Sequence, residues 1–356
     1  MPKEISLLVS LLRVALWNMQ YDDELFACMD DTQWKKIMQM AGKHSVKAIA
    51  FDGVMKLPSR LQPSRLLLLE WAAYVDVTEK RYEHKLEVLQ ELSTLFYRNN
   101  IKMLPFKGFA MAQYYPVPEH REFGDIDIYL FGKHNEGNKL LLDNGARQDY
   151  VSYKHLCVIY KKTMIENHAF FLNIYDSRKI RASEKILKKI ITDCNSSDFW
   201  IEFPVNWQAL FYMFHAIHHF SWGAFSLRIL TDLALFWDAN KGKIDFGDYR
   251  KKLESVGLIK QADALTSIAV KVLGIDKSIT PLYATNATFE EKILYNMLHP
   301  FSAPQKKELN VCEILSLKWN RFFYRAKSYE LIYPRENYKR FISSVITNIK
   351  NLSFFK

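Results

Sequence analysis

The stretch of residues 102–130 constrains the fold of this chain more than any other segment, because acidic and apolar side chains alternate near its end. On a β-strand, successive side chains point to opposite faces. Asp125 and Asp127 are therefore expected to share one face, while the apolar residues around them point into a core. The preceding residues predict a first strand over 101–106, a turn at Gly108, a short helix and a proline-bounded loop.

Two carboxylates held side by side repel each other, and a divalent cation is the usual remedy. Hard oxygen ligands at this spacing suit Mg²⁺ or Mn²⁺. The alternative is a surface strand that shows its polar face to solvent. We disfavour it because Gly108, Arg121 and the paired acids Asp125 and Asp127 occur together and in this order.

These residues also carry a resemblance to a known family. Lys107-Gly108, then Arg121, then Gly-Asp-Ile-Asp-Ile at 124–128, resembles the nucleotidyltransferases that share a DNA polymerase β-like catalytic core. More narrowly, the pattern is similar to a poorly characterised nucleotidyltransferase family with Lys-Gly where better-known members have Gly-Ser. The resemblance implies an α+β fold with a small mixed sheet and helices. It also implies two acids on one strand and a third on a neighbouring strand, which together bind two metal ions.

The sequence departs from the better-known members directly after the glycine, where Phe109 stands in place of a phosphate-contacting serine. The phosphate grip must therefore differ or be weak. Gly108 would let the backbone approach the triphosphate, with the following short helix directing its N-terminus at anionic oxygens. Lys107 could add a cation there, although a lysine at a strand end is often only solvated.

Arg121 lies four residues before Asp125 and is a candidate for bidentate contact with phosphate. The alternative is an ion pair within the loop, with Glu119 or Glu122 as its partner. The sequence leaves both readings of Arg121 open.

Glu166 is our choice for the third acid. It lies two residues before His168 in an expected strand, so both side chains share a face. The narrower family has a Glu-x-His pair at this point, and the resemblance implies that Glu166 joins Asp125 and Asp127 as a metal ligand and catalytic residue. His168 is assigned to nucleotide binding. The alternatives are a solvent-facing Glu166, and Glu202 as the third acid.

The histidines at 215, 218 and 219 are spaced to share one helix face, as zinc-binding pairs do. The helix lacks the glutamate of an HExxH motif and is otherwise apolar and aromatic. The resemblance matches His215 and His219 to a His-x₃-His helix, and Arg228 and Asp232 to an LRxxxD-like stretch. It implies that these helices pack against the catalytic layer. We assign His219 to nucleotide binding, and favour a structural polar network over a metal site, with Arg228–Asp232 orienting a histidine.

The periodicity of apolar residues divides the chain into three regions: a helical region over 1–99, a catalytic core over 100–205, and a helical region with a basic tail over 206–356. Expected helices in the first two regions are 1–17, 31–42 capped by Asp31 or Thr32, 63–99 with Leu86, Leu89, Leu92 and Leu95 on one side, and 133–144 closed by Gly145. Expected strands follow at 147–154, 155–162 and 163–175, with Lys161-Lys162 near a turn. Further helices are expected at 207–220, 226–239, 245–257, 261–273 and 289–298.

The chain has a formal net charge of +10, and residues 317–356 hold nine Lys or Arg against two Glu, a net of +7. Such a tail can attract nucleic acid, anionic lipid or an acidic polymer, but a solvated helix face is the simpler interpretation. Four widely spaced cysteines without a CxxC pair argue against a structural zinc site or a disulfide framework and are typical of a protein in the reducing cytoplasm. No apolar run is long enough to span a membrane.

These observations favour an enzyme that moves a nucleoside monophosphate from an NTP, such as ATP, to an acceptor hydroxyl or phosphate by a two-metal mechanism. The acceptor (a small molecule, a sugar phosphate, a protein or RNA) cannot be read from the sequence. One alternative is a weak or inactive nucleotide-binding protein on the same fold, because the serine after the glycine is missing. Another is an RNA nucleotidyltransferase, suggested by the basic aromatic tail.

Overall fold

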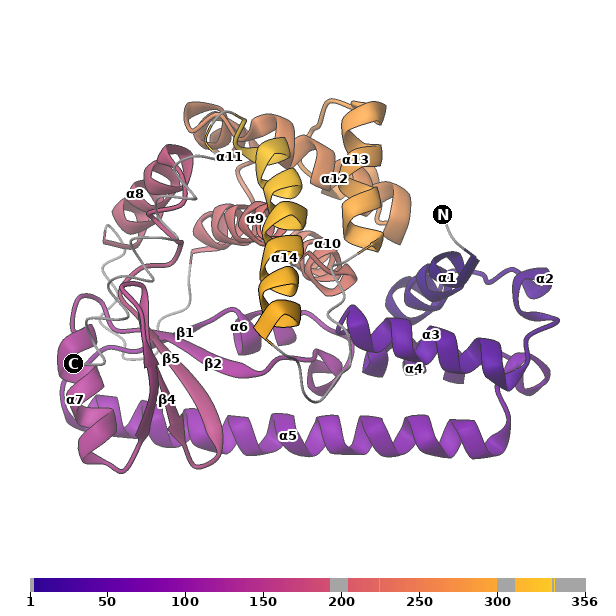
Figure 1. The fold of residues 1–356 in the computed structure, drawn as a ribbon, viewed down its shortest axis with the longest axis horizontal. Coiled ribbons are helices and arrows are strands. Elements are labelled where there is room, and N and C mark those ends of the chain that lie inside the picture. Colours follow the sequence, from indigo (N-terminus) through magenta and orange to yellow (C-terminus); the bar gives the residue numbers. More distant parts are fainter. Residues whose placement is uncertain (1–2, 193–203, 224, 300–310, 335, 337–356) are drawn as a thin grey trace.

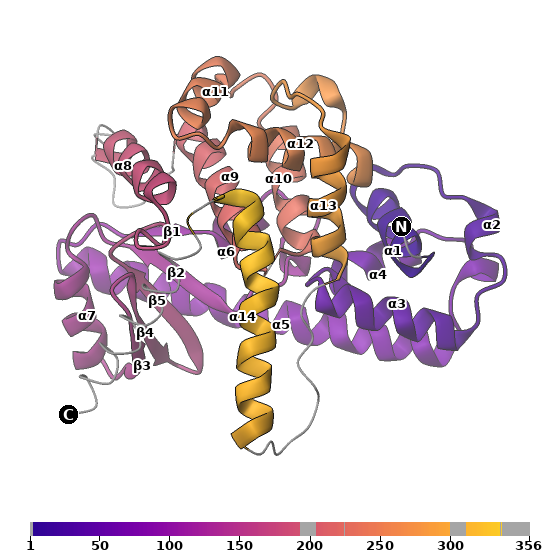
Figure 2. The same cartoon turned by 45° about the horizontal axis from the view of Figure 1, so that its top comes forward.

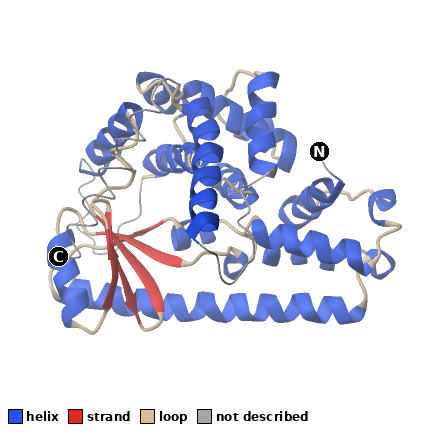
Figure 3. Ribbon diagram, viewed as in Figure 1, coloured by secondary structure: helices blue, strands red, loops and turns tan. Residues whose placement is uncertain are grey.

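The computed structural model describes residues 3–192, 204–223, 225–299, 311–334 and 336 (Figure 1). Within them, the strands form a single block, and helices make up most of the rest (Figure 3). The predicted α+β class, a small mixed sheet flanked by helices, is confirmed. No helix among the described residues combines the length and the apolar character that crossing a membrane requires.

The N-terminal region is helical, as predicted. Its helices are α1 (Lys3–Trp17), α2 (Asp23–Phe26), α3 (Asp31–Lys43), α4 (Lys47–Met55) and α5 (Arg65–Arg98). The cap of α3 is Asp30, one residue before the predicted candidates, because Asp30 and Gln33 form a reciprocal capping box. Helix α4 was not predicted; it has no clear amphipathic pattern because it is packed on several sides.

Helix α5 runs beneath both the N-terminal helices and the sheet (Figure 1). Its 34 residues span roughly 50 Å. The inward face of its second half consists of Val88, Leu89, Leu92 and Phe96, whereas Leu86 is 36% exposed. The prediction that Leu86 shares one side with the buried Leu89 and Leu92 was wrong, because a strict three-residue spacing drifts around a helix with 3.6 residues per turn.

The sheet has five strands in the order β1-β2-β5-β4-β3. They are β1 (Leu104–Phe106), β2 (Asp125–Tyr129), β3 (Arg147–Val151), β4 (His155–Tyr160) and β5 (Thr163–His168). β2 and β5 are parallel, and the other neighbouring pairs are antiparallel. Helix α7 (His134–Asp143) lies between β2 and β3 and is followed by Gly145 with a φ of +88°, as predicted.

A two-residue turn joins β4 to β5 and sets their register. Lys161 and Lys162 both have positive φ (48° and 63°), the combination that a type I′ hairpin turn requires. Tyr160 therefore pairs with Thr163, and His155 pairs with His168. β5 ends at His168, earlier than predicted, because the amides of Ala169 and Phe170 turn back to the carbonyl of Lys154.

The two faces of the sheet differ. One face is apolar and packs in a small core with α5 and α7, through Ile126, Ile128 and Ile165. The other face carries the acidic residues and lies toward the C-terminal helices, where Phe106 packs edge-on against Phe211 of α9. The alternation in the sequence therefore separates a core from a polar site.

The remaining helices are α6 (Gly108–Ala112), α8 (Arg178–Thr192), α9 (Val205–Ser221), α10 (Leu227–Ala239), α11 (Phe246–Ser255), α12 (Ile259–Leu273), α13 (Ala287–Leu298) and α14 (Val311–Ile332). α8 was not predicted. α14 packs against α9 (Figure 2), and its C-terminal end is buried at Tyr329. Most of the predicted basic tail beyond α14 lies outside the described residues.

The N-terminal and C-terminal helices share the larger core. The side chains of Arg13 and Trp17 on α1 donate hydrogen bonds to the carbonyls of Val272 and Leu273 at the end of α12, both at 2.9 Å. The two helical regions therefore pack directly against each other.

Candidate active site

Three carboxylates converge where β2 and β5 lie side by side. Asp127 stands directly opposite Glu166 in the parallel register, and Asp125 lies two residues earlier on β2. One oxygen from each carboxylate lies within 4.8 Å of the others. Asp127 and Glu166 are 3% and 9% exposed, while Asp125 is more accessible. The structure therefore brings together the three acids singled out in the sequence.

The three carboxylates have different pKa values because their neighbours differ. The charge of Asp127, together with burial, raises the pKa of Asp125 to about 6. Burial would raise the pKa of Asp127, but Lys107 and His168 outweigh it and hold that pKa well below its usual value. Burial would likewise raise the pKa of Glu166, yet His168 and Lys107 lower it to about 2. Asp127 and Glu166 are therefore ionised at neutral pH, and their charges contribute to the raised pKa of Asp125.

Lys107 points into this site. Its Nζ donates a hydrogen bond to Asp127, and its side chain is 15% exposed. Burial would lower the pKa of Lys107, but the three carboxylates raise it. Its φ of +63° is a strained conformation for a residue with a side chain. The alternative of a solvated lysine at a strand end is therefore wrong.

Gly108 has a packing role that the sequence did not reveal. A Cβ atom at this position would come within 2.7 Å of the Phe123 ring. The ring of Phe109 packs on the same Phe123, with centroids 4.9 Å apart, and on Tyr82 at 5.1 Å. The residue that replaces the serine of better-known members therefore belongs to an aromatic cluster.

Arg121 is almost completely buried and joins the loop before β2 to α10. Its Nε and Nη2 each donate to the carboxylate of Asp232 at 2.8 Å, and its Nη1 donates to the carbonyl of Gly108 at 3.0 Å. The alternative of an ion pair within the loop is wrong: Glu122 instead accepts hydrogen bonds from the amides of Lys47 and Ala48. The two guanidinium nitrogens that could have bound a phosphate bidentately bind the carboxylate of Asp232 instead.

Asp232 has further partners. Tyr115 donates to it at 2.8 Å, and the predicted contact with Arg228 is present at 3.4 Å. The carboxylate therefore fixes Arg121 and Tyr115 more closely than it fixes Arg228.

His168 lies at the centre of the polar face with no exposed surface. Its Nε2 is 2.7 Å from an oxygen of Asp127 and 3.1 Å from an oxygen of Glu166. Its Nδ1 is 3.2 Å from the carbonyl oxygen of Phe170. His168 therefore contacts two of the three acids directly.

Sequence reasoning missed His155, which lies beside His168. Its Nδ1 is 3.4 Å from Glu166, and its Nε2 is 2.8 Å from the hydroxyl of Tyr150. Burial and His168 lower the pKa of His155 to about 3, so its ring is neutral. The sequence did contain a signal for this pairing. His155 and His168 are each six residues from the Lys161-Lys162 turn, so they lie opposite each other in a hairpin.

A second missed residue is Lys154, which precedes β4. Burial and the charge of Lys107 lower the pKa of Lys154 to about 8. A lysine with a pKa near neutrality beside acidic groups is a common feature of functional sites. No sequence pattern marked this residue.

Two of the three histidines of α9, His215 and His218, lie within range of the charges of Lys107 and Lys154. Burial holds the pKa of both His215 and His218 well below its usual value, so both rings are neutral. His215 packs on His219, with ring centroids 4.3 Å apart, and His218 Nδ1 is 3.8 Å from Asp176. Among the described residues, none of the three belongs to a group spaced for metal binding. Glu202, the competing third acid, lies outside the described residues.

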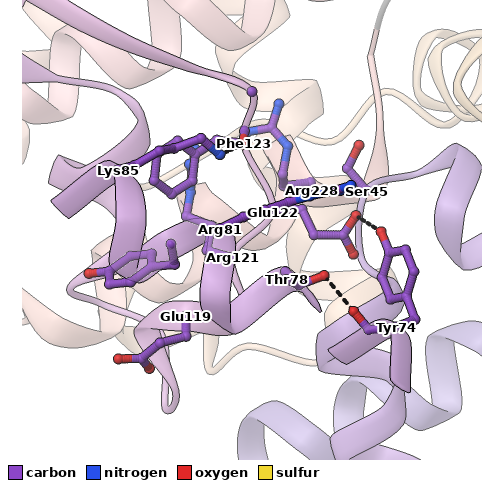
Figure 4. Close-up of a pocket in the computed structure, with 12 residues that line it drawn as sticks. Ser45, Tyr74, Thr78, Arg81, Lys85, Glu119, Arg121, Glu122, Phe123 and Arg228 are labelled. Atoms are coloured by element: carbon purple, nitrogen blue, oxygen red, sulfur yellow. Dashed lines mark hydrogen bonds between the residues drawn. The ribbon is translucent and has the colours of Figure 1, made fainter. Parts of the chain in front are cut away.

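A pocket of about 280 Å³ opens beside the start of β2 (Figure 4). Its cationic lining comes from Arg81 and Lys85 of α5, Arg121 and Arg228, and it reaches Gly124, the residue before Asp125. Lys85 donates to the carbonyl of Phe123 at 2.6 Å. Two acids, Glu119 and Glu122, complete the charged lining, so the pocket suits an anionic group next to the carboxylates.

The donor set fits hard divalent ions. Three carboxylates with ligand oxygens this close together offer the oxygen coordination that Mg²⁺ and Mn²⁺ prefer. The raised pKa of Asp125 records the mutual repulsion that such an ion relieves.

The paired acids of β2, the third acid of β5 and the helices around a small mixed sheet together define the nucleotidyltransferase class. A model of the family described as "Uncharacterised nucleotidyltransferase" matches residues 30–274, more than half of the chain. The chain belongs to this family. No curated protein and no solved structure matches it. α1, α2, α13 and α14 lie outside the matched range.

Proposed function

We propose that this protein transfers a nucleoside monophosphate from an NTP to a hydroxyl or phosphate of an acceptor. The observation that carries the proposal is the convergence of Asp125, Asp127 and Glu166 on two strands held in register. Family membership supports nucleotidyl transfer as the general reaction. Nucleotidyl transfer needs cations around the reacting phosphate more than it needs a protein nucleophile.

Each acid has a distinct part in this proposal. Asp127 and Glu166, whose pKa values are low, stay ionised and hold divalent ions of the Mg²⁺ class. Bound there, such ions neutralise charge on the phosphoryl oxygens and orient the substrates. Asp125 is the more accessible acid and faces the acceptor side. Lys107, His168 and His219 are proposed to border the nucleotide.

The cationic pocket supports an alternative phosphate grip. Phe109 offers no hydroxyl, and its ring is packed against Phe123 and Tyr82. Arg81, Lys85 and Arg228 provide positive charge on the other side of Phe123, next to Gly124. We propose that these three side chains bind anionic oxygens of the triphosphate or of a phosphate-bearing acceptor.

Magnesium-dependent release of pyrophosphate, measured across the four common NTPs, tests the proposal. Asp127→Asn keeps the shape of the side chain and removes its charge, so release should fall by about 1,000-fold. Asp143→Asn, at an exposed position on α7, is the matched control and should behave as wild type. Equal activity of Asp127→Asn and wild type would remove the proposal.

A second candidate is a nucleotide-binding protein without turnover. The ion pair between Lys107 and Asp127 favours it, because the amine occupies an oxygen that a metal ion would use. Calorimetry with each NTP and Mg²⁺ separates the two functions. Tight binding without pyrophosphate release supports the binding protein, and absence of nucleotide binding contradicts both.

A further inference from the structure

The polar face of the sheet contains a second group of potential metal ligands besides the three carboxylates. His155 and His168 are opposite each other on β4 and β5, with ring centroids 4.8 Å apart. Glu166 Oε2 is 3.1 Å from His168 Nε2 and 3.4 Å from His155 Nδ1. One ligand atom from each residue lies within 4.8 Å of the other two. The three residues therefore surround one point.

Hydrogen bonds determine which nitrogen of His155 carries the proton. The hydroxyl of Tyr150 donates its single hydrogen to Glu166 Oε1 at 3.1 Å. The hydroxyl oxygen of Tyr150 is 2.8 Å from His155 Nε2, and with its hydrogen on Glu166 it accepts the N–H of that nitrogen. In a neutral ring, Nδ1 then keeps its lone pair. This buried Nδ1 has no hydrogen-bond partner.

The lone pair of His155 Nδ1 faces the carboxylate of Glu166 with no hydrogen between them. Two electron-rich atoms at 3.4 Å repel each other unless a cation lies nearby. Removal of a buried acceptor from water without such a partner carries a free-energy cost. This arrangement is therefore suited to a bound cation.

His168 presents the same arrangement from the opposite side. Its Nδ1 faces the carbonyl of Phe170, which only accepts, so Nδ1 carries a hydrogen. Its Nε2 faces carboxylate oxygens of Asp127 and Glu166, which also only accept. Nε2 is therefore directed into the carboxylate cluster, close enough to Glu166 for one metal ion to contact both residues.

The spacing of these atoms matches the coordination shell of a small metal ion. With metal–ligand bonds of about 2.0–2.1 Å, neighbouring ligands of a tetrahedral ion lie about 3.3 Å apart. The two distances from Glu166 Oε2 to the histidine nitrogens, 3.1 and 3.4 Å, bracket this value. Imidazole nitrogens suit Zn²⁺ and related transition metals, whereas Mg²⁺ prefers oxygen.

We propose that His155, Glu166 and His168 bind a divalent transition-metal ion of the Zn²⁺ class, at a site that shares Glu166 with the carboxylate trio. Three protein ligands leave one coordination position open to water or to a substrate oxygen. Tyr150 contacts both His155 and Glu166 and orients these two ligands. The site does not depend on the proposed nucleotidyl transfer, because its test measures metal binding alone.

The experiment titrates untagged protein with Zn²⁺ by calorimetry in the presence of excess Mg²⁺, which saturates oxygen-only sites. His155→Gln keeps an N–H donor for Tyr150 but has no ligand atom at the Nδ1 position. His168→Asn keeps a donor for Phe170 but lacks Nε2. Each change should weaken Zn²⁺ affinity by about 100-fold. Visible absorption of Co²⁺-loaded protein should show nitrogen-containing four-coordinate bands in wild type and lose them in both variants.

Two controls separate this site from its neighbours. His84→Ala removes a histidine that is 46% exposed on α5 and should leave Zn²⁺ affinity unchanged. Asp125→Asn removes a ligand of the carboxylate trio only, so Zn²⁺ should still bind, whether or not nucleotide is turned over. Zn²⁺ affinity that survives both histidine changes, or that is lost in Asp125→Asn alone, overturns the proposal, as does absence of Zn²⁺ binding to wild type. If melting curves show that His168→Asn is unfolded, His155→Gln decides the question.

Discussion

The two faces of the sheet are built from alternating residues of the same strands, yet they are stabilised in opposite ways. Ile126, Ile128 and Ile165 are 0–1% exposed and gain free energy from leaving water. Asp127 and Glu166, on the other face, are almost as deeply buried but lose hydration. Their burial is tolerated because Lys107 and His168 contact them.

This difference indicates that the polar face lowers the stability of the folded protein in order to form the candidate active site. The apolar face would stabilise any sheet that packs on a helix, because its residues only have to be apolar and of the right size and shape. The polar face holds three acids, two histidines and a lysine close together in space, which folding alone does not require. Substitutions on the polar face should therefore lower mainly activity, and substitutions on the apolar face should lower mainly stability.

The largest effect is expected from Asp125→Asn. Loss of one carboxylate should lower pyrophosphate release by about 1,000-fold. The same change should raise the stability of metal-free protein by about 1–3 kcal/mol at pH 7, because it removes repulsion from Asp127. Denaturant titrations in EDTA provide the measurement. An active or a destabilised Asp125→Asn would contradict the contrast between the faces.

The pH dependence of stability tests the raised pKa of Asp125 independently. The pKa of Asp125 rises from 3.8 unfolded to about 6 folded, so its protonated form favours folding. Its contribution is fully present below pH 3.8 and is lost as the pH rises through 6. Metal-free wild type should therefore lose stability over this window relative to Asp125→Asn, and parallel curves would contradict the assignment.

The next largest effect is expected from Arg121→Met, on the polar side of the molecule. This change leaves Asp232 buried without its bidentate partner and should cost about 3–5 kcal/mol. Arg121→Met combined with Asp232→Leu should recover much of the loss, because no unpaired charge remains. Urea unfolding of the two single variants and the double variant measures the coupling. A double variant that equals the sum of the singles would show that the pair is not coupled.

On the apolar face, Ile128→Ala should cost about 2–5 kcal/mol, because the small core beneath the sheet cannot close around the cavity. Pyrophosphate release by the folded protein should change little. Leu142→Ala, at a position 39% exposed, is the control and should be nearly neutral. A loss of activity comparable to that of Asp125→Asn would show that the two faces are not independent.

The smallest effect is expected at His120, in the loop before β2. Its ring contacts Asp52 at 2.8 Å and Glu79 at 2.9 Å. Burial would lower its pKa, but these two carboxylates raise it. Its contribution is therefore present below its unfolded pKa and is lost as the pH rises through the folded value. His120→Gln should remove about 1 kcal/mol at pH 5.5 and less at pH 9, measured by urea unfolding.

Much of the local structure was predictable because it follows from short-range periodicity. The alternation around Asp125 placed the acids on one face, and the Glu166–His168 spacing placed the third acid on a strand. The Lys-Lys turn and the helix that ends before Gly145 were also predictable. These features depend on residues within a few positions of one another.

The rest depends on tertiary contacts that no local pattern contains. Arg121 and its partner Asp232 are 111 positions apart, and the sequence suggested phosphate or a nearby glutamate as the partner of Arg121 instead. Gly108 was expected to serve a ligand, but the nearest obstacle to a side chain there is the ring of Phe123. Lys154 has its lowered pKa only because the fold buries it beside Lys107.

The single long helix α5 restricts how substrates can reach the site. Thr78, Arg81, Tyr82 and Lys85 of this helix form one wall of the cationic pocket. The same helix continues without a break under the N-terminal helices and under the sheet (Figure 1). Widening the pocket by swinging those two parts away from each other would require an unbroken helix to bend. We therefore expect α5 to stay straight while nucleotide enters and product leaves. The motion should be confined to the opposite wall of the pocket, where Arg228 of α10 lies.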